Sequence, residues 1–408
     1  MSRFWRRPTR TLVAATLAAV IAIAYLGPSS ATAGTAGTKA NPNLSPITIG
    51  FISQELELVS YVEGRLASQA AVKYINSELG GIDGHPLQLK VCEAGDTPET
   101  TVACAQQFIN DPSIKLVIVV SDNDTPAYTI LNKAGIATLG TAFAANDWTY
   151  KNVYSFDLGL GVLAVPILEA SLQHVNRMVI ACTNDPGYTP LCDVMQKLGQ
   201  EHGIKMAKQI LIDPNEADFT GTVAELQADK GDAIYALTYP TQCLPLANSL
   251  KAANVNVKVF TFDVCVNKQS VGASAYNGWY FQFSSRLSQT VSRSSTVVAA
   301  QRILAKYGSK DTSQFGFASL AMVSTLSARD MFVAAGGAKA TRTDVAKAAA
   351  GYHHSYGFYP PISCPGPAPF IGACVTSALE LRQQGKQIVP VGGYETPDLA
   401  PFKAFLTK

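Results

Sequence analysis

The sequence has little charge and no excess of either sign. Only 15% of its 408 residues are charged, and 32 basic residues are matched by 30 acidic ones. A nucleic-acid-binding protein would show a basic excess or a basic stripe, and a disordered chain would combine low hydrophobicity with high net charge. Glycine, at 31 residues, is too rare for a collagen-like chain. With 47% hydrophobic residues, the composition predicts a globular protein of two or three domains with no nucleic-acid partner.

Motifs for catalysis and metal binding are also missing. The sequence contains no H-E-x-x-H, G-x-S-x-G, Walker A or C-x-x-C pattern. Asp122-Asn123-Asp124 resembles the start of an EF-hand loop but lacks its glycine and its terminal glutamate. Gly159–Ala164 fits the dinucleotide pattern G-x-G-x-x-A, but a plain crossing between two halves of the chain also accounts for it. We therefore expect no enzymatic activity, no metal and no cofactor.

The N-terminus is typical of an export signal. Four arginines among the first ten residues precede the apolar stretch Leu12–Leu26, and Ala31-Thr32-Ala33 provides small residues for cleavage before Gly34. A membrane span needs roughly 20 residues, so cleavage after Ala33 is favoured over an uncleaved anchor. Arg6-Arg7 leaves the choice between the Sec and twin-Arg routes open. The region around the cleavage site contains no cysteine, so the sequence gives no sign of a lipid anchor. We expect the mature protein in a periplasm-like space or at the cell surface.

All eight cysteines follow this signal. They form four pairs of near neighbours: Cys92 and Cys104, Cys182 and Cys192, Cys243 and Cys265, Cys364 and Cys374. An even count in an exported chain predicts disulfides. Eight cysteines allow about 105 pairings, so sequential pairing is a hypothesis that rests on the spacing.

Strand and helix patterns alternate along most of the chain. After a short flexible lead at 34–45, apolar strands at 47–52, 87–91, 116–120 and 136–139 alternate with helices. A second unit restarts with a helix at 162–174 and continues with strands at 178–181, 209–212, 233–237, 257–262 and 278–283. Helices at 292–307, 314–335 and 344–350 and a hairpin at 379–391 complete the pattern. This alternation predicts parallel sheets covered by helices on both faces.

Several of these elements carry a resemblance to a known family. The stretches are Ile47–Gly50, Ala70–Asn76 followed by Gly80–Leu87, Phe108-Ile109, Leu116–Val120, Ala134–Ile136 and Gly385–Val391. Over about residues 46–392 the chain resembles the extracytoplasmic solute-binding proteins of ABC importers, of the branched-chain-amino-acid-binding (Leu/Ile/Val-binding) type.

The resemblance implies the type I periplasmic-binding fold. This is an α/β fold of two doubly wound, Rossmann-like lobes with parallel central sheets, joined by three crossing segments. The N-lobe would contain residues 46–157 and 284–357, the C-lobe 158–283 and 358–392, and 393–408 would form a tail. The implied function is capture of a small solute by a monomer through hinge closure, and delivery to ABC permease subunits. A sensor or receptor component with the same fold is the alternative.

Candidate ligand-binding residues follow the strands, because open α/β sheets bind ligands outside their carboxyl ends. They are Gln54, Ser121, Asn123, Thr141, Ala142 and Phe143 in the N-lobe, and Asp185, Tyr188, Tyr239 and Asp263 in the C-lobe. Such residue types also make ordinary turns and caps. Tyr188 and Tyr239 stand out, since a large aromatic residue suits a ligand wall better than a turn.

The resemblance also implies roles for these residues. Ser121 and Thr141-Ala142 would hold a carboxylate, whereas Tyr188, Tyr239 and Asp263 would hold an ammonium group. Phe143-Ala144 stands where relatives keep a hydroxyl. This departure predicts room for an apolar or aromatic solute, such as an aromatic acid or amide.

Overall fold

The computed structural model describes residues 38–56, 60–122, 124–144, 146–186, 188–398 and 400. The predicted export signal and the candidate ligand residue Asn123 lie outside these ranges. Within them, no helix is both long enough and apolar enough to cross a membrane.

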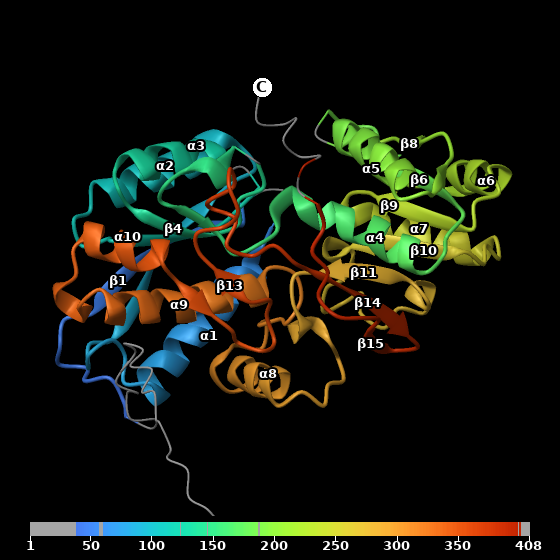
Figure 1. The fold of residues 1–408 in the computed structure, drawn as a ribbon. Coiled ribbons are helices and arrows are strands. Elements are labelled where there is room, and N and C mark those ends of the chain that lie inside the picture. The colour runs from blue at the N-terminus through green and yellow to red at the C-terminus, as the bar shows by residue number, and fades with distance from the viewer. Residues whose placement is uncertain are drawn as a thin grey trace, which may run out of the picture. The chain divides into compact units, whose positions relative to one another are not determined.

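The first sheet has five parallel strands in the order β2-β1-β3-β4-β5. Figure 1 labels β1 and β4 of this sheet. Its strands are β1 (Ile47–Gln54), β2 (Leu87–Ala94), β3 (Leu116–Val120), β4 (Ala137–Gly140) and β5 (Val153–Ser155), and its first helices are α1 (Val62–Glu78), α2 (Pro98–Ile109) and α3 (Thr125–Lys133). Every residue of β3 is buried. A continuous apolar run of this kind is typical of a central parallel strand with both faces covered.

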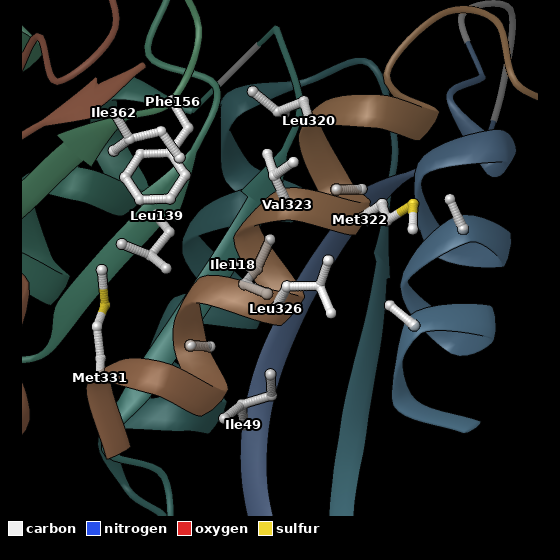
Figure 2. Close-up of a cluster of buried hydrophobic side chains, with 14 of the residues drawn as sticks. Ile49, Ile118, Leu139, Phe156, Leu320, Met322, Val323, Leu326, Met331 and Ile362 are labelled. Carbon is white, nitrogen blue, oxygen red and sulfur yellow. The ribbon is translucent and has the colours of Figure 1, made fainter. Parts of the chain in front are cut away.

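Three later helices return to this sheet. They are α8 (Ser295–Tyr307), α9 (Ala318–Ala334) and α10 (Arg342–Ala350). Figure 2 shows Val323 and Leu326 of α9 packed over Ile118 of β3, with Ile49 of β1 beside them. All residues from Ala318 to Ala328 are buried, because α9 lies between the sheet and its neighbouring helices. The apolar pattern predicted helix α9 itself, but only the family resemblance predicted that this segment packs against the first sheet.

The second sheet follows the order β15-β14-β11-β10-β9-β6-β7, with β8 also paired to β6. Its strands are β6 (Arg177–Thr183), β7 (Lys205–Met206), β8 (Ile210–Ile212), β9 (Ala233–Leu237), β10 (Lys258–Phe262), β11 (Tyr280–Phe283), β14 (Leu379–Gln384) and β15 (Gln387–Pro390). Its helices are α4 (Val165–Leu172), α5 (Thr189–Glu201), α6 (Thr220–Ala228) and α7 (Pro240–Ala252). In this sheet, only the pairs β11–β14 and β14–β15 are antiparallel, and both belong to the C-terminal hairpin. The predicted fold class, two α/β units with parallel central sheets, is confirmed.

The family resemblance placed the last crossing of the chain into the second lobe at residue 358. In the structure the chain rejoins the second sheet later. Phe358, Tyr359 and Ile362 are buried in the core of the first sheet. The hydroxyl of Tyr359 donates to the carbonyl oxygen of Phe156 at 2.5 Å. The short strands β12 (His353–His354) and β13 (Ile362–Ser363) pair with each other, and the second sheet resumes only at β14. Because this segment is rich in proline and lacks a regular apolar period, the sequence did not show which sheet it contacts.

All four disulfides have the predicted sequential pairing, Cys92–Cys104, Cys182–Cys192, Cys243–Cys265 and Cys364–Cys374. The first three tie a strand, or the turn after it, to a helix. Cys182 of β6 is joined to Cys192 of α5, and Cys243 of α7 to Cys265 in the turn after β10. Each bond therefore stiffens a loop that adjoins a sheet edge.

Among the four disulfides, Cys243–Cys265 should contribute the most stability, because it closes the longest loop, with a sequence separation of 22. The chain-entropy argument gives about 3 kcal/mol for the double Cys243→Ser, Cys265→Ser variant. Urea unfolding measures it, with the shorter Cys182–Cys192 link removed for comparison. A loss below about 1 kcal/mol would contradict this estimate.

Three carboxyl groups, those of Glu169, Glu380 and Glu395, influence one another near the β14–β15 hairpin. Glu380 is 2% exposed and Glu169 is 5% exposed, and neither carboxyl oxygen of Glu380 has a hydrogen-bond partner in the described part of the chain. Glu395 is held nearby, since its backbone exchanges hydrogen bonds of 3.0 and 2.7 Å with Ala378. Burial, and then the charges of Glu169 and Glu395, raise the pKa of Glu380 well above its usual value. Burial, and then Glu169, raise the pKa of Glu395 to about 7.

These raised pKa values predict that the folded state is less stable at alkaline pH. The unfolded carboxyl groups have pKa values near 4.3, so their contribution is fully present below that pH and is lost as the pH rises through about 7. The wild-type protein should lose unfolding free energy between pH 5 and pH 8. In Glu380→Gln this loss should be smaller than in the wild type by more than about 1.4 kcal/mol, which corresponds to one pKa unit. Urea titrations at both pH values measure it. The exposed Glu225→Gln control should keep the wild-type difference, and equal pH profiles for Glu380→Gln and wild type would refute the effect.

Candidate functional site

Gln54 joins the carboxyl ends of β1 and β3. Its Oε1 accepts hydrogen bonds from the hydroxyl of Ser121 and the backbone N–H of Asp122, both at 2.9 Å, and its Nε2 donates to Asp96 at 3.2 Å. Gln54 and Ser121 are 1% and 0% exposed. These two candidate ligand residues therefore brace the sheet edge in this structure.

Thr141 and Ala142 fix the loop that follows β4. The hydroxyl of Thr141 lies 3.0 Å from the carbonyl oxygen of Ser121 and 3.1 Å from Oδ2 of Asp124. The carbonyl oxygen of Ala142 accepts a hydrogen bond from the indole of Trp148 at 2.6 Å. Both candidates are buried, so they also hold the loop in place.

Phe143 belongs to an aromatic group on the same half of the protein. Its ring centroid lies 6.0 Å from that of Phe317, which in turn lies 4.7 Å from Tyr61, and both contacts are edge-to-face. The hydroxyl of Tyr61 donates to Oδ2 of Asp122. The aromatic group thus extends from the loop after β4 to the loop after β3.

Tyr188 and Tyr239 come together at the carboxyl edge of the second sheet. Their ring centroids are 5.1 Å apart in an edge-to-face contact. Tyr239 is extended, with φ −60° and ψ 150°, and α7 begins at the next residue, Pro240. This agrees with the preference of a residue that precedes proline. Burial, and then a hydrogen bond with Asp185, raise the pKa of the Tyr239 hydroxyl. The structure therefore brings together three of the four candidates expected on this half.

Electrostatic effects link side chains at the two sheet edges. The charge of Asp122 contributes to the raised pKa of Tyr188, after burial, and Tyr188 contributes to that of Tyr61. Asp263, the fourth candidate on the second half, interacts with Asp157 and Glu63. We define the junction cluster as Tyr61, Glu63, Asp122, Asp157, Tyr188 and Asp263.

Burial is the main cause of the raised pKa of each carboxyl group in the junction cluster. It raises the pKa of Asp263 to about 8, assisted by the charges of Asp157 and Glu63. It raises the pKa of Glu63 to about 7, although the backbone N–H of Phe317 donates to Glu63 at 3.2 Å.

The other two carboxyl groups behave similarly. Burial raises the pKa of Asp157 to about 6 against hydrogen bonds from Leu158 and Ser284. Asp122 keeps an exposed side chain, yet loss of solvation among the surrounding groups and the charge of Asp96 raise its pKa to about 6 against the bond from Tyr61. Glu63, Asp122 and Asp263 still retain accessible surface. Accessible carboxyl groups with perturbed pKa values are typical of functional sites.

The sequence prediction missed four members of the junction cluster. Asp122 lies two residues after β3, in the strand-end segment that supplied Ser121 and Asn123, but residue type alone did not single it out. Glu63 lies in the first turn of α1, where an acidic residue is ordinary helix chemistry, and Asp157 lies in a crossing segment after β5. Tyr61 precedes α1 without any pattern that marks it. Tyr188 and Asp263 were among the predicted residues.

The protein has two parallel sheets covered by helices, and the polar and aromatic side chains of the junction cluster follow the carboxyl ends of strands in both sheets. These two features define its class. The family profile described as periplasmic binding protein matches residues 46–367. The chain therefore belongs to the periplasmic binding protein family. No curated protein shows significant sequence similarity to it.

Solved structures share this fold at low sequence identity. A solute-binding protein of an ABC transporter from R. palustris, in complex with 4-hydroxybenzoate, superposes with a TM-score of 0.70 at 14% identity, covering 87% of this chain and 98% of that one. An ABC transporter substrate-binding protein from Desulfitobacterium hafniense, in complex with Leu, gives 0.65 at 18% identity, covering 86% and 100%. A leucine-binding protein from Thermotoga maritima gives 0.67 at 13% identity, covering 87% and 99%. At these identities the similarity shows the fold alone.

Proposed function

We propose that the protein is an exported solute-binding component of an ABC importer, without catalytic activity of its own. It captures a small organic solute between its two lobes, closes around it and delivers it to permease subunits. One lobe comprises the first sheet with α1–α3 and α8–α10 and the segment up to about residue 375, and the other comprises the second sheet with α4–α7. This division keeps the predicted crossings near residues 157 and 284 and moves the last one.

The observation that carries this proposal is the junction cluster, whose members come from both lobes. A solute that contacts Asp122 and Glu63 on one side and Tyr188 and Asp263 on the other would hold the lobes together. We propose Phe143, Tyr188, Tyr239 and Asp263 as ligand contacts and Asp185 as the residue that orients Tyr239. Gln54, Ser121, Thr141 and Ala142 support the loops. The relatives that bind Leu and 4-hydroxybenzoate support a solute of similar size.

A thermal-shift screen with amino acids, aromatic acids, amides and amines tests solute binding, because a ligand of the folded state alone raises stability by RT ln(1 + [L]/Kd). Delivery is tested by adding the protein and its solute to liposomes that contain a candidate ABC permease with its ATPase. Stimulated ATP hydrolysis supports the importer role. Binding without stimulation, together with capture of a membrane kinase, would favour the sensor alternative.

A further inference from the structure

Two aspartates are buried together beside the carboxyl ends of β3 and β4. Asp124 immediately precedes α3, and Asp147 begins the short 3₁₀ helix Asp147–Thr149. Thr125 connects them, because it follows Asp124 in the chain and its hydroxyl donates to Oδ2 of Asp147 at 2.7 Å. On the other side, the hydroxyl of Thr141 lies 3.1 Å from Oδ2 of Asp124. We call Asp124 and Asp147 the aspartate pair.

The aspartate pair lacks a positively charged partner. Neither residue forms an ion pair with a lysine, arginine or histidine in the described part of the chain. Oδ1 of each aspartate is buried and has no hydrogen-bond partner among the described residues. Burial, and then the charge of Asp147, raise the pKa of Asp124 well above its usual value, and burial raises the pKa of Asp147 to about 7. Ionised carboxylates in such surroundings are costly unless a positive charge compensates them.

The hydroxyl of Tyr128 is a third buried oxygen at the same place. It has no hydrogen-bond partner in the part of the chain that the structure describes, and Tyr128 is fully buried. Tyr128 lies one helical turn after Asp124, and its backbone N–H donates to the Asp124 carbonyl oxygen at 3.0 Å. Side chains four residues apart share a helix face and lean toward the N-terminus of the helix. The Tyr128 ring therefore leans toward the aspartate pair, in agreement with the contribution of both carboxylate charges, after burial, to the raised pKa of its hydroxyl.

We propose that the aspartate pair binds a hard divalent cation of the size of Ca²⁺, with the hydroxyls of Tyr128 and Thr141 among its ligands. Ca²⁺ takes oxygen ligands in flexible geometry, and two carboxylates balance its charge. No three His, Cys, Asp or Glu side chains of the described residues are grouped for metal binding, so neutral oxygens complete the ligand set. Because these oxygens come from separate segments, they match none of the metal-binding motifs whose absence predicted a metal-free protein. The ion would join the loop after β3 to the loop after β4, whether or not the protein serves an importer.

Titration calorimetry with inorganic salts tests this site directly. The protein is treated with EGTA, dialysed at pH 8 and titrated with CaCl₂, MgCl₂ or NaCl, and its melting temperature is measured with each salt. Ca²⁺ should bind one-to-one and raise the melting temperature. It should bind at least about tenfold tighter than Mg²⁺, which demands near-ideal octahedral geometry and keeps its water. No effect of Ca²⁺, or a preference for Mg²⁺ or Na⁺, would overturn the inference.

Variants that keep shape and remove charge complete the test. Asp124→Asn and Asp147→Asn should each lower the Ca²⁺ affinity about tenfold or more, because affinity follows the charge of the ligand set. The exposed Asp311→Asn should not change it. In EGTA the first two variants should melt no lower than the wild type, because each removes a buried charge that has no partner. Circular dichroism checks folding, and if one variant does not fold, the other decides. Wild-type Ca²⁺ affinity in the folded variants would indicate an adventitious ion only and would overturn the inference.

Discussion

Replacing Tyr239 by alanine should weaken solute binding by about 2 kcal/mol or more, roughly 30-fold, as expected for an aromatic anchor. Tyr239 stands at the carboxyl edge of the second sheet, extended ahead of α7 and packed edge-to-face on Tyr188. Its loss removes one ring of the pair and leaves Asp185 without the tyrosine hydroxyl. Titration calorimetry with the solute found by screening measures the change.

Two further variants separate contact from support. Tyr239→Phe keeps the ring and loses one hydrogen bond, so it should cost only about 0.5–1.5 kcal/mol. Tyr307→Ala removes a tyrosine from α8, where it packs on Tyr74, and should leave affinity unchanged. The competing role for Tyr239 is structural, because its ring packs on Tyr188 and could hold the start of α7 in place without touching a solute. A sharp drop in the melting temperature of the unliganded Tyr239→Ala protein, with unchanged affinity per folded molecule, would show that structural role instead.

The largest loss of stability should follow from Trp148→Ala, at about 3–5 kcal/mol. Trp148 is fully buried, and its ring centroid lies 5.3 Å from that of Phe370. Its indole N–H donates a hydrogen bond to the carbonyl oxygen of Ala142, and its own carbonyl oxygen accepts a hydrogen bond from the backbone N–H of Gly372 at 2.6 Å. One side chain thus supports both the loop after β4 and the segment that follows Cys364. The substitution leaves a cavity and an unpaired carbonyl at Ala142.

Denaturant unfolding of Trp148→Phe provides the comparison. Phenylalanine retains most of the apolar contact with Phe370 and loses only the hydrogen bond to Ala142, so its cost should be clearly smaller. Because the Ala142 loop adjoins the junction cluster, Trp148→Ala should also weaken solute binding in the folded fraction. A cost below about 1.5 kcal/mol for Trp148→Ala would mean that the loop does not depend on this residue.

The periodic parts of the chain could be predicted from the sequence. The continuous apolar run of β3 predicted a buried parallel strand, and the Tyr239-Pro240 step predicted an extended residue followed by a helix. The four disulfides were predicted from cysteine spacing. In each case the signal is local, because neighbouring residues in the sequence are also neighbours in the structure.

What escaped prediction depends on contacts between distant segments. Tyr359 bonds to Phe156, 203 residues earlier, and nothing in the intervening sequence marks that pairing. Gln54 and Ser121 follow strands, as ligand residues often do, yet they satisfy each other, so residue type and position cannot distinguish a ligand contact from a brace. Glu63 joins the junction cluster only through the effect of its charge on Asp263, which follows a strand of the other sheet.

The central claim is that a solute is captured between two lobes that close around it. Small-angle scattering of the protein, without solute and with a saturating solute that raises its melting temperature, tests this most directly. The account predicts a smaller radius of gyration in the bound state, because the carboxyl edges of the two sheets approach each other. An unchanged radius of gyration with a saturating, stabilising solute would contradict capture by closure.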